Sequence, residues 1–259
     1  MPWNVPFLPH MFDMPAEIYC PACRAGMNGR DIAGHKNNYT LLRCAACRSV
    51  TANPLPTPAQ LSDFYQNYHG SQMYGRKEEA KIRRARKRIE KYISKDNGAR
   101  FLDVGCNHGY AVKAALDLGW DAHGIDVDAQ TIAAAAARFG DGYFTASTIE
   151  NFAAPGTGRQ FDTVYTSEVI EHVPDVDAFI DAISKLLTHR GRLFLTTPDA
   201  GHFRVPRRFD TWGTVKPPLH LHYFTKDGMS QLLRRHGFTV ERFILSLKPQ
   251  MKLVARKRF

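Results

Sequence analysis

Four cysteines near the start of the chain have the spacing of a metal site. They form two Cys-x-x-Cys pairs, Cys20 with Cys23 and Cys44 with Cys47, with twenty residues between the pairs. Two residues between thiolates let a tight turn direct both sulfurs at one ion, and two such turns supply a closed tetrahedral shell. A segment of this size has too little core to fold without a metal. The pattern predicts structural zinc in a module over residues 1–53, with two disulfides as the alternative, which a reducing cytoplasm disfavours.

A glycine-containing loop follows a short apolar run further along the chain. Residues 101–104 are typical of a buried strand, which leads through Gly105 and Gly109 into a helix with one apolar face. Asp126 ends the next expected strand. A strand, a glycine loop, a helix and a second strand that ends in an acid are typical of nucleotide-binding α/β domains. The glycines let the backbone approach a ligand closely, and the Asp126 carboxylate can accept hydrogen bonds from two ribose hydroxyls.

The charge beside this loop indicates the kind of ligand. A pyrophosphate needs the helix N-terminus clear for an anion, whereas Asp103 stands at the end of the strand that enters the loop. An acid there suits a positively charged cofactor, and S-adenosylmethionine carries a sulfonium and an ammonium group. Asn107 replaces the middle glycine of the usual pattern, so the hydrogen bonding of the loop differs there.

The order of these motifs resembles that of the class I S-adenosylmethionine-dependent methyltransferases. The similar segments are, in order, motif I at 101–109, the acidic loop at 124–128, the fourth strand at 161–166, the fifth strand at 191–198 and the last helix at 222–238. The resemblance implies an α/β fold with a Rossmann-like, mostly parallel sheet whose last strand is antiparallel. Residues 19–68 are also similar to the N-terminal region of a subgroup that carries a zinc-ribbon-like module. Members of that subgroup often modify sugars, glycans or natural products.

The resemblance also implies the residues that bind the methyl donor. They are Asp103, Gly105, Asn107 and Gly109 around the methionine part, Asp126 at the ribose, Thr148 and Ile149 beside the adenine, and Ser167 facing the sulfonium.

Acidic and imidazole side chains gather where the methyl acceptor is expected to bind. Glu168, Glu171 and His172 follow the fourth expected strand, and His220 lies in the long segment 199–224 after the fifth. Open α/β sheets bind ligands beyond the carboxyl ends of their strands. Three interpretations stay open: a histidine general base, a divalent metal held by the four residues, or a structural pair at Glu171 and His172. Glu-x-x-Glu-His with a distant histidine resembles magnesium-dependent small-RNA 2′-O-methyltransferases, and ubiquinone-pathway O-methyltransferases carry a related motif.

The region between the module and the expected sheet is strongly basic. The chain has a formal net charge of +10, and residues 76–95 hold ten Lys or Arg and three Glu. This segment is either the solvated face of an amphipathic helix or a surface for a polyanion. We assign residues 54–98 to a linker and helices that cap the cofactor, where Tyr65 and Tyr68 either close over the cofactor or pack inside a helix. The methyltransferase domain then covers residues 99–259.

The predicted function is S-adenosylmethionine-dependent methylation of a hydroxyl of a sugar, glycan or secondary metabolite. A metal-assisted RNA 2′-O-methyltransferase is the alternative within this class, and a non-catalytic zinc and Rossmann scaffold is the alternative outside it. No apolar run reaches the roughly 18 residues needed to span a bilayer, and the N-terminus lacks the basic start and apolar stretch of a signal peptide. We therefore expect a cytoplasmic protein without a membrane span.

Overall fold

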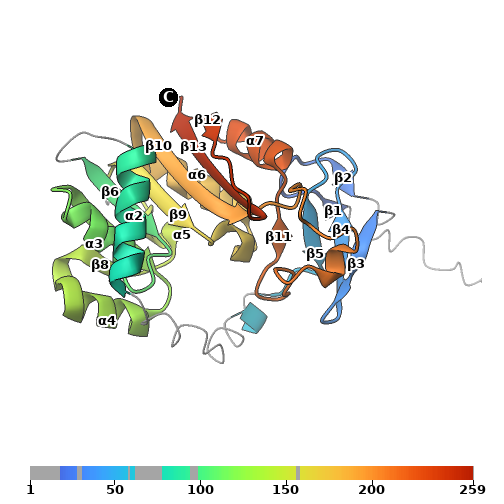
Figure 1. The fold of residues 1–259 in the computed structure, drawn as a ribbon, viewed down its shortest axis with the longest axis horizontal. Coiled ribbons are helices and arrows are strands. Elements are labelled where there is room, and N and C mark those ends of the chain that lie inside the picture. The colour runs from blue at the N-terminus through green and yellow to red at the C-terminus, as the bar shows by residue number, and fades with distance from the viewer. Residues whose placement is uncertain are drawn as a thin grey trace, which may run out of the picture.

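The computed structural model describes residues 18–27, 31–57, 59–61, 78–93, 99–155 and 158–258. A large α/β unit and a smaller β-rich module lie side by side, and β10 (Leu187–Pro198) of the large sheet runs toward the module while the antiparallel β13 (Gln250–Lys257) runs away from it (Figure 1). Tyr65 and Tyr68 lie outside the described residues, as does much of the predicted capping segment. No helix in the described ranges is long and apolar enough to cross a membrane.

A seven-stranded sheet forms the centre of the large unit. Its strands are β6 (Arg100–Val104), β7 (Asp121–Asp126), β8 (Phe144–Ala146), β9 (Phe161–Ser167), β10 (Leu187–Pro198), β12 (Phe238–Phe243) and β13 (Gln250–Lys257), in the order β12-β13-β10-β9-β6-β7-β8. The pairs from β10 to β8 are parallel, and β13 is antiparallel to both of its neighbours. The predicted Rossmann-like sheet with an antiparallel last strand is confirmed.

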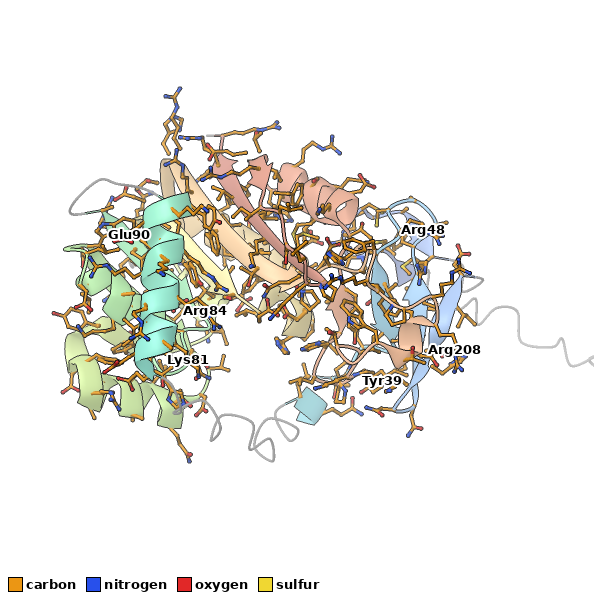
Figure 2. The ribbon with its side chains drawn as sticks, in the orientation of Figure 1. Tyr39, Arg48, Lys81, Arg84, Glu90 and Arg208 are labelled. Atoms are coloured by element: carbon orange, nitrogen blue, oxygen red, sulfur yellow. The ribbon has the colours of Figure 1, made fainter. Side chains whose placement is uncertain are left out.

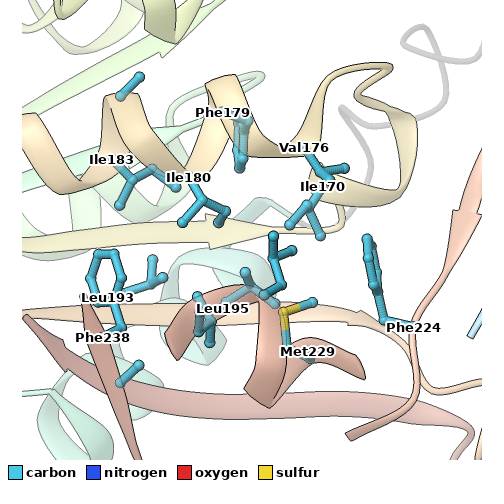
Figure 3. Packing of buried hydrophobic residues seen from close by; sticks show 14 of the residues in the cluster. Ile170, Val176, Phe179, Ile180, Ile183, Leu193, Leu195, Phe224, Met229 and Phe238 are labelled. Carbon is cyan, nitrogen blue, oxygen red and sulfur yellow. The ribbon is translucent and has the colours of Figure 1, made fainter. Parts of the chain in front are cut away.

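Helices cover both faces of this sheet, as its two buried faces require. They are α2 (Glu78–Tyr92), α3 (Tyr110–Leu116), α4 (Ala129–Phe139), α5 (Ile149–Phe152), α6 (Val176–Leu186) and α7 (Lys226–Arg235). Helices α2, α3 and α4 share one apolar cluster with Phe101, Tyr165 and Phe194. On the opposite face, Ile180 of α6 and Met229 of α7 pack with Leu195 of β10 (Figure 3). The site therefore stands on a rigid sheet fixed from both sides.

The N-terminal module contains two small sheets. One pairs β1 (Ile18–Tyr19) with β2 (Gly26–Met27), and the other has the order β11-β5-β4-β3 with β3 (Ile32–Lys36), β4 (Tyr39–Arg43), β5 (Val50–Asn53) and β11 (His222–Tyr223). Strand β11 comes from the segment after β10, and its residues His222 and Tyr223 pair with Thr51 and Val50. The module's sheet is thus completed by a strand that the sequence places far away, within the expected acceptor segment.

Candidate functional site

The four predicted zinc ligands converge in the structure. The Sγ atoms of Cys20 and Cys47 are 3.6 Å apart and those of Cys23 and Cys44 are 3.5 Å apart, and all four lie within 4.8 Å of one another. A tetrahedron with zinc–sulfur bonds of about 2.3 Å has edges of about 3.8 Å, whereas a disulfide needs about 2.05 Å. The cysteines are therefore arranged as metal ligands, and the disulfide alternative does not fit.

The cysteine cluster is attached to the start of α7. Thr225, which caps that helix, donates its hydroxyl to the Cys47 carbonyl at 2.6 Å, and its backbone N–H donates to Ser49 Oγ at 3.1 Å. A Cβ at Gly228, in the first turn, would lie 2.2 Å from Ser49 Oγ and 3.2 Å from Cys47 Sγ. Only a glycine permits this approach, so the cysteine cluster and the large unit pack directly against each other.

The glycine loop has the backbone conformation that the sequence predicts. Gly105, Asn107 and Gly109 all have positive φ, at 74°, 47° and 76°. A Cβ on Gly105 would lie 2.4 Å from a methyl group of Val169, and one on Gly109 would lie 2.6 Å from the Phe144 ring. Asparagine is among the residues that tolerate this region best, which explains how Asn107 replaces the usual glycine.

The two acids of the donor site differ in environment. Asp126 accepts hydrogen bonds from the backbone N–H groups of Asn107 at 2.9 Å and Asp128 at 3.0 Å, so its carboxylate is fixed at the mouth of the loop. Asp103 is buried, and burial together with the nearby Asp126 charge raises the pKa of Asp103 to about 8. A cationic ligand would relieve that unfavourable charge. The environment of these two acids therefore favours a positively charged ligand.

The remaining predicted donor residues lie at the same end of the sheet. Thr148 caps α5 and accepts from Asn151 N–H at 3.2 Å, while the Ile149 side chain is buried in the core. Ser167 ends β9, where its Oγ lies 2.8 Å from Thr196 Oγ1.

Three of the four predicted acceptor-site residues form a compact cluster. One ligand atom from each of Glu171, His172 and His220 lies within 4.8 Å of the others. The His172 Nδ1–H donates to the Leu219 carbonyl at 2.6 Å, and the His220 Nδ1–H donates to the Thr214 carbonyl at 2.7 Å. Both Nδ1 atoms are used in this way, and the backbone of Glu168 is a second hydrogen-bond partner of the His172 ring.

Burial disfavours the charged forms of these groups. It lowers the pKa of His220 to about 4 and that of His172 below its usual value, and it raises the pKa of Glu171 well above its usual range. Glu171 is fully buried and accepts from the Thr197 hydroxyl through Oε2 at 2.9 Å, while its Oε1 has no hydrogen-bond partner. That oxygen lies 4.0 Å from His172 Nε2. A buried carboxylate oxygen that has no hydrogen-bond partner and lies beside two imidazoles is stabilised when a cation or a proton binds to it.

Glu168 stands apart from this cluster. It is exposed, has a φ of 60°, and its Oε1 accepts from Thr196 Oγ1 and Gln250 Nε2, both at 2.9 Å. The predicted four-residue metal set is therefore reduced to three, because Glu168 is engaged with β10 and β13. His222, which belongs to the same segment as His220, is buried instead against Thr51 Oγ1 at 2.9 Å.

Comparison with known proteins fits this arrangement. The family model described as a methyltransferase domain matches residues 74–242. The chain belongs to this methyltransferase family. Among curated relatives, the ubiquinone biosynthesis O-methyltransferase of Xanthomonas oryzae pv. oryzae (strain PXO99A) is 36% identical over 104 residues, covering 39% of this chain and 43% of the relative. The chain thus matches less than half the length of that relative.

Solved methyltransferases share the fold of this family member. The 1,6-didemethyltoxoflavin-N1-methyltransferase of Burkholderia thailandensis, with bound S-adenosylhomocysteine, has a TM-score of 0.58 at 20% identity over 87% of this chain and 98% of its own. The magnesium protoporphyrin IX methyltransferase of Synechocystis PCC 6803, with bound S-adenosylmethionine, has a TM-score of 0.53 at 17% identity over 79% and 99%. These likenesses establish the class I methyltransferase fold.

Several residues that shape the acceptor site carry no signal in the sequence. The Leu219 and Thr214 carbonyls orient the two histidines, and Thr197 holds Glu171. Every residue has a backbone carbonyl, and a single threonine at the end of a strand can have many roles, so neither feature indicates a site in the sequence. Only the backbone path of the segment after β10 reveals these roles.

Proposed function

We propose that this chain is an S-adenosylmethionine-dependent O-methyltransferase that acts on a hydroxyl group of a small molecule. The observation that carries the proposal is the buried, unpartnered Oε1 of Glu171 beside two oriented imidazoles at the carboxyl end of a class I methyltransferase sheet. The name of the curated relative, an O-methyltransferase of ubiquinone biosynthesis, favours a small-molecule hydroxyl over a glycan or an RNA.

The donor side supports S-adenosylmethionine as the methyl source. Asp126, fixed by two backbone N–H groups, keeps free lone pairs that can accept from the ribose hydroxyls. The buried Asp103 gains a partner when a cationic group binds beside it, which favours its charged form. Two acids in these positions suit the ammonium and sulfonium groups of the donor.

The acceptor side supports activation of a hydroxyl. Methyl transfer is an in-line displacement, so the enzyme must align the acceptor oxygen with the methyl carbon and help that oxygen lose its proton. Glu171, His172 and His220 offer one carboxylate oxygen and two Nε2 atoms, a donor set that suits Mn²⁺, Zn²⁺ or Mg²⁺. A divalent ion held there would lower the pKa of a hydroxyl bound to it. The Leu219 and Thr214 carbonyls fix both imidazoles, as backbone acceptors do for metal-binding histidines.

A general base is the competing role for the same residues. In its neutral form, either His172 or His220 has one ring nitrogen without a hydrogen, which could accept the hydroxyl proton directly. The metal role is favoured because it also satisfies Glu171 Oε1, which a simple base at either histidine leaves unpaired.

Binding of S-adenosylhomocysteine tests the donor side. Calorimetry should show binding to the wild-type protein and a loss of about 100-fold in Asp126→Ala, because a hydrogen-bonded charge is removed from the ribose site. Asp121→Ala is the matched control, since Asp121 is exposed at the opposite end of the same strand. Absence of binding to the wild-type protein would refute the proposed function and favour a non-catalytic scaffold.

Metal binding separates the two roles of the acceptor cluster. Titration with Mn²⁺, followed by electron paramagnetic resonance on the zinc-loaded protein, should reveal a site that is lost in Glu171→Gln and kept in the exposed Glu150→Gln control. Equal Mn²⁺ binding by both variants, or none by the wild-type protein, would reject the metal and leave the histidine base.

A further inference from the structure

A row of polar side chains crosses three strands near the carboxyl ends of β9 and β10. In the strand registers, Thr196 of β10 pairs with Ser167 of β9 on one side and with Lys252 of β13 on the other. Directly paired residues project from the same face of a sheet. Tyr165 and Val254, two residues away on their strands, both belong to the cluster beneath α2. Lys252 therefore lies on the α2 face of the sheet, next to Thr196.

Helix α2 directs basic side chains toward the same place. Arg84 and Arg88 are four residues apart and share one helix face. Arg88 donates to the Tyr165 hydroxyl at 2.9 Å, so this face lies over β9, one row before Ser167. Figure 2 shows Arg84 on the side of α2 turned toward the acceptor segment, and Glu90 on the other side. Basic groups from a helix and from a distant strand thus meet at one end of the sheet.

These basic groups lack the acidic partners that their neighbours have. On the outer side of α2, Arg83 pairs with Glu79 and Arg86 pairs with Glu90. Among the described residues, no carboxylate lies within ion-pair distance of Arg84, Arg88 or Lys252.

The basic groups also repel one another. Partial burial, followed by the charges of Arg88, Lys248 and Arg84, lowers the pKa of Lys252, and the charge of Glu168 offsets only part of this. Glu168 already accepts from Thr196 and Gln250. Like charges held together with too little counter-charge are relieved when an anion binds among them.

The position of Lys252 indicates whether the methyl donor or the methyl acceptor would supply the anion. Strand β13 is three strands from β6, which carries Asp103, and at about 4.8 Å per strand the separation is about 14 Å. A methyl donor seated at the glycine loop would lie beside β6, whose neighbour β9 is nearer than β13, and Arg88 lies over β9 through its bond to Tyr165. We infer that Lys252 and Arg84 bind an anionic group, a carboxylate or a phosphate, on the methyl acceptor. This inference rests on the proposed function and names the class of its substrate.

The test uses orthophosphate as the probe and separates the two sources of an anion. Protein saturated with S-adenosylhomocysteine has its donor carboxylate subsite filled, so phosphate titrated into this complex and followed by two-dimensional NMR reports on the acceptor side. We expect weak binding that falls about fivefold in Lys252→Met and in Arg84→Gln, since each loses one charge-assisted contact. Arg83→Gln, whose side chain is paired and exposed, should bind phosphate like the wild-type protein.

Three outcomes would overturn the inference. The first is phosphate binding only in the absence of S-adenosylhomocysteine, which would assign the basic groups to the donor carboxylate. The second is equal phosphate binding by all variants, which would indicate nonspecific surface attraction. The third is no phosphate binding in the saturated complex. Failure of S-adenosylhomocysteine to bind would instead refute the proposed function. In that case the dependence of phosphate binding on Lys252 and Arg84 would still be measured in the free protein, so the two failures can be told apart.

A second measurement uses catalysis. Between catechol and 3,4-dihydroxybenzoate, which differ by one carboxylate, the wild-type enzyme should prefer the acid by about tenfold in kcat/KM, and Lys252→Met should lose most of that preference. A preference for the neutral catechol would contradict the inference.

Discussion

The proposed donor side and the proposed acceptor side of this molecule are assembled in different ways. Asp103, Gly105, Asn107, Gly109 and Asp126 come from one strand-loop-helix-strand unit, and most of their contacts lie within it. The acceptor cluster joins the end of β9 to a segment nearly fifty residues later, through His172 and the Leu219 carbonyl. That segment in turn continues into β11 and completes the sheet of the zinc module. A local unit can fold correctly by itself, whereas the acceptor side depends on two distant parts being in place.

Removal of the zinc predicted at the four cysteines should have the largest effect, and it should affect the two sides differently. The binding free energy of a structural zinc site is on the order of 10 kcal/mol, and Thr225 ties the Cys47 carbonyl to α7. Chelation or Cys47→Ser should therefore greatly increase amide hydrogen exchange in residues 214–225, because β11 loses its partner strand β5. Residues 101–126 should keep their protection.

Hydrogen exchange with mass spectrometry checks this prediction, and re-addition of zinc should restore protection after chelation. Unchanged exchange at 214–225 would show that the acceptor segment folds independently of the module. Loss of protection at 101–126 as well would mean that the two sides unfold together.

A substitution inside the donor loop should have the next largest effect. Gly105→Ala adds a methyl group 2.4 Å from Val169 Cγ2 at a φ of 74°, which should cost about 2 kcal/mol of stability through overpacking and strain. Affinity for S-adenosylhomocysteine should fall with it, because the loop must shift. Gly142→Ala, which meets nothing within 4 Å, is the control, and thermal unfolding with calorimetry measures both effects. Equal behaviour of the two variants would show that the loop is not tightly packed.

The ion-pair cluster that attaches the zinc module should have a smaller effect. Asp177 of α6 contacts Arg24 of the first knuckle, Arg235 and His236, the last with a nitrogen–oxygen distance of 2.7 Å. Burial tends to raise the pKa of Asp177, but the bonds from His236 and Arg235 outweigh it and lower this pKa. Since the folded-state pKa lies below the unfolded value, the stabilisation is complete above about pH 4 and is lost as the pH falls through the folded-state pKa.

Asp177→Asn should therefore cost about 1 kcal/mol at pH 7 and almost nothing at the acidic limit. Denaturant unfolding at several pH values measures this difference. Asp181→Asn on the same helix removes only an exposed pair with Lys185 and should change stability little. A cost for Asp177→Asn that does not vary with pH would assign the contact to packing rather than charge.

Much of the donor side could be predicted from the sequence, because its residues are neighbours along the chain. The four cysteines were equally predictable, since their spacing is itself the geometric requirement. The residues of the acceptor cluster were harder to predict. Four residues were expected, and the Glu168 side chain lies outside the cluster because it is bonded to Thr196 and Gln250. Its backbone turns at a φ of 60°, which no pattern of residue types indicates.

The sequence by itself determined the α/β class, the cysteine cluster and the conformation of the glycine loop. Each of these follows from short-range geometry or from the alternation of apolar and polar residues. Only the tertiary structure decided that β11 joins the cysteine module to His220 and that Glu171 is buried with one oxygen that has no partner. It also decided that Lys252 and Arg84 lie near each other with no ion-pair partner among the described residues. These features depend on contacts between residues far apart in the chain, and such contacts are fixed by the packing of the whole molecule.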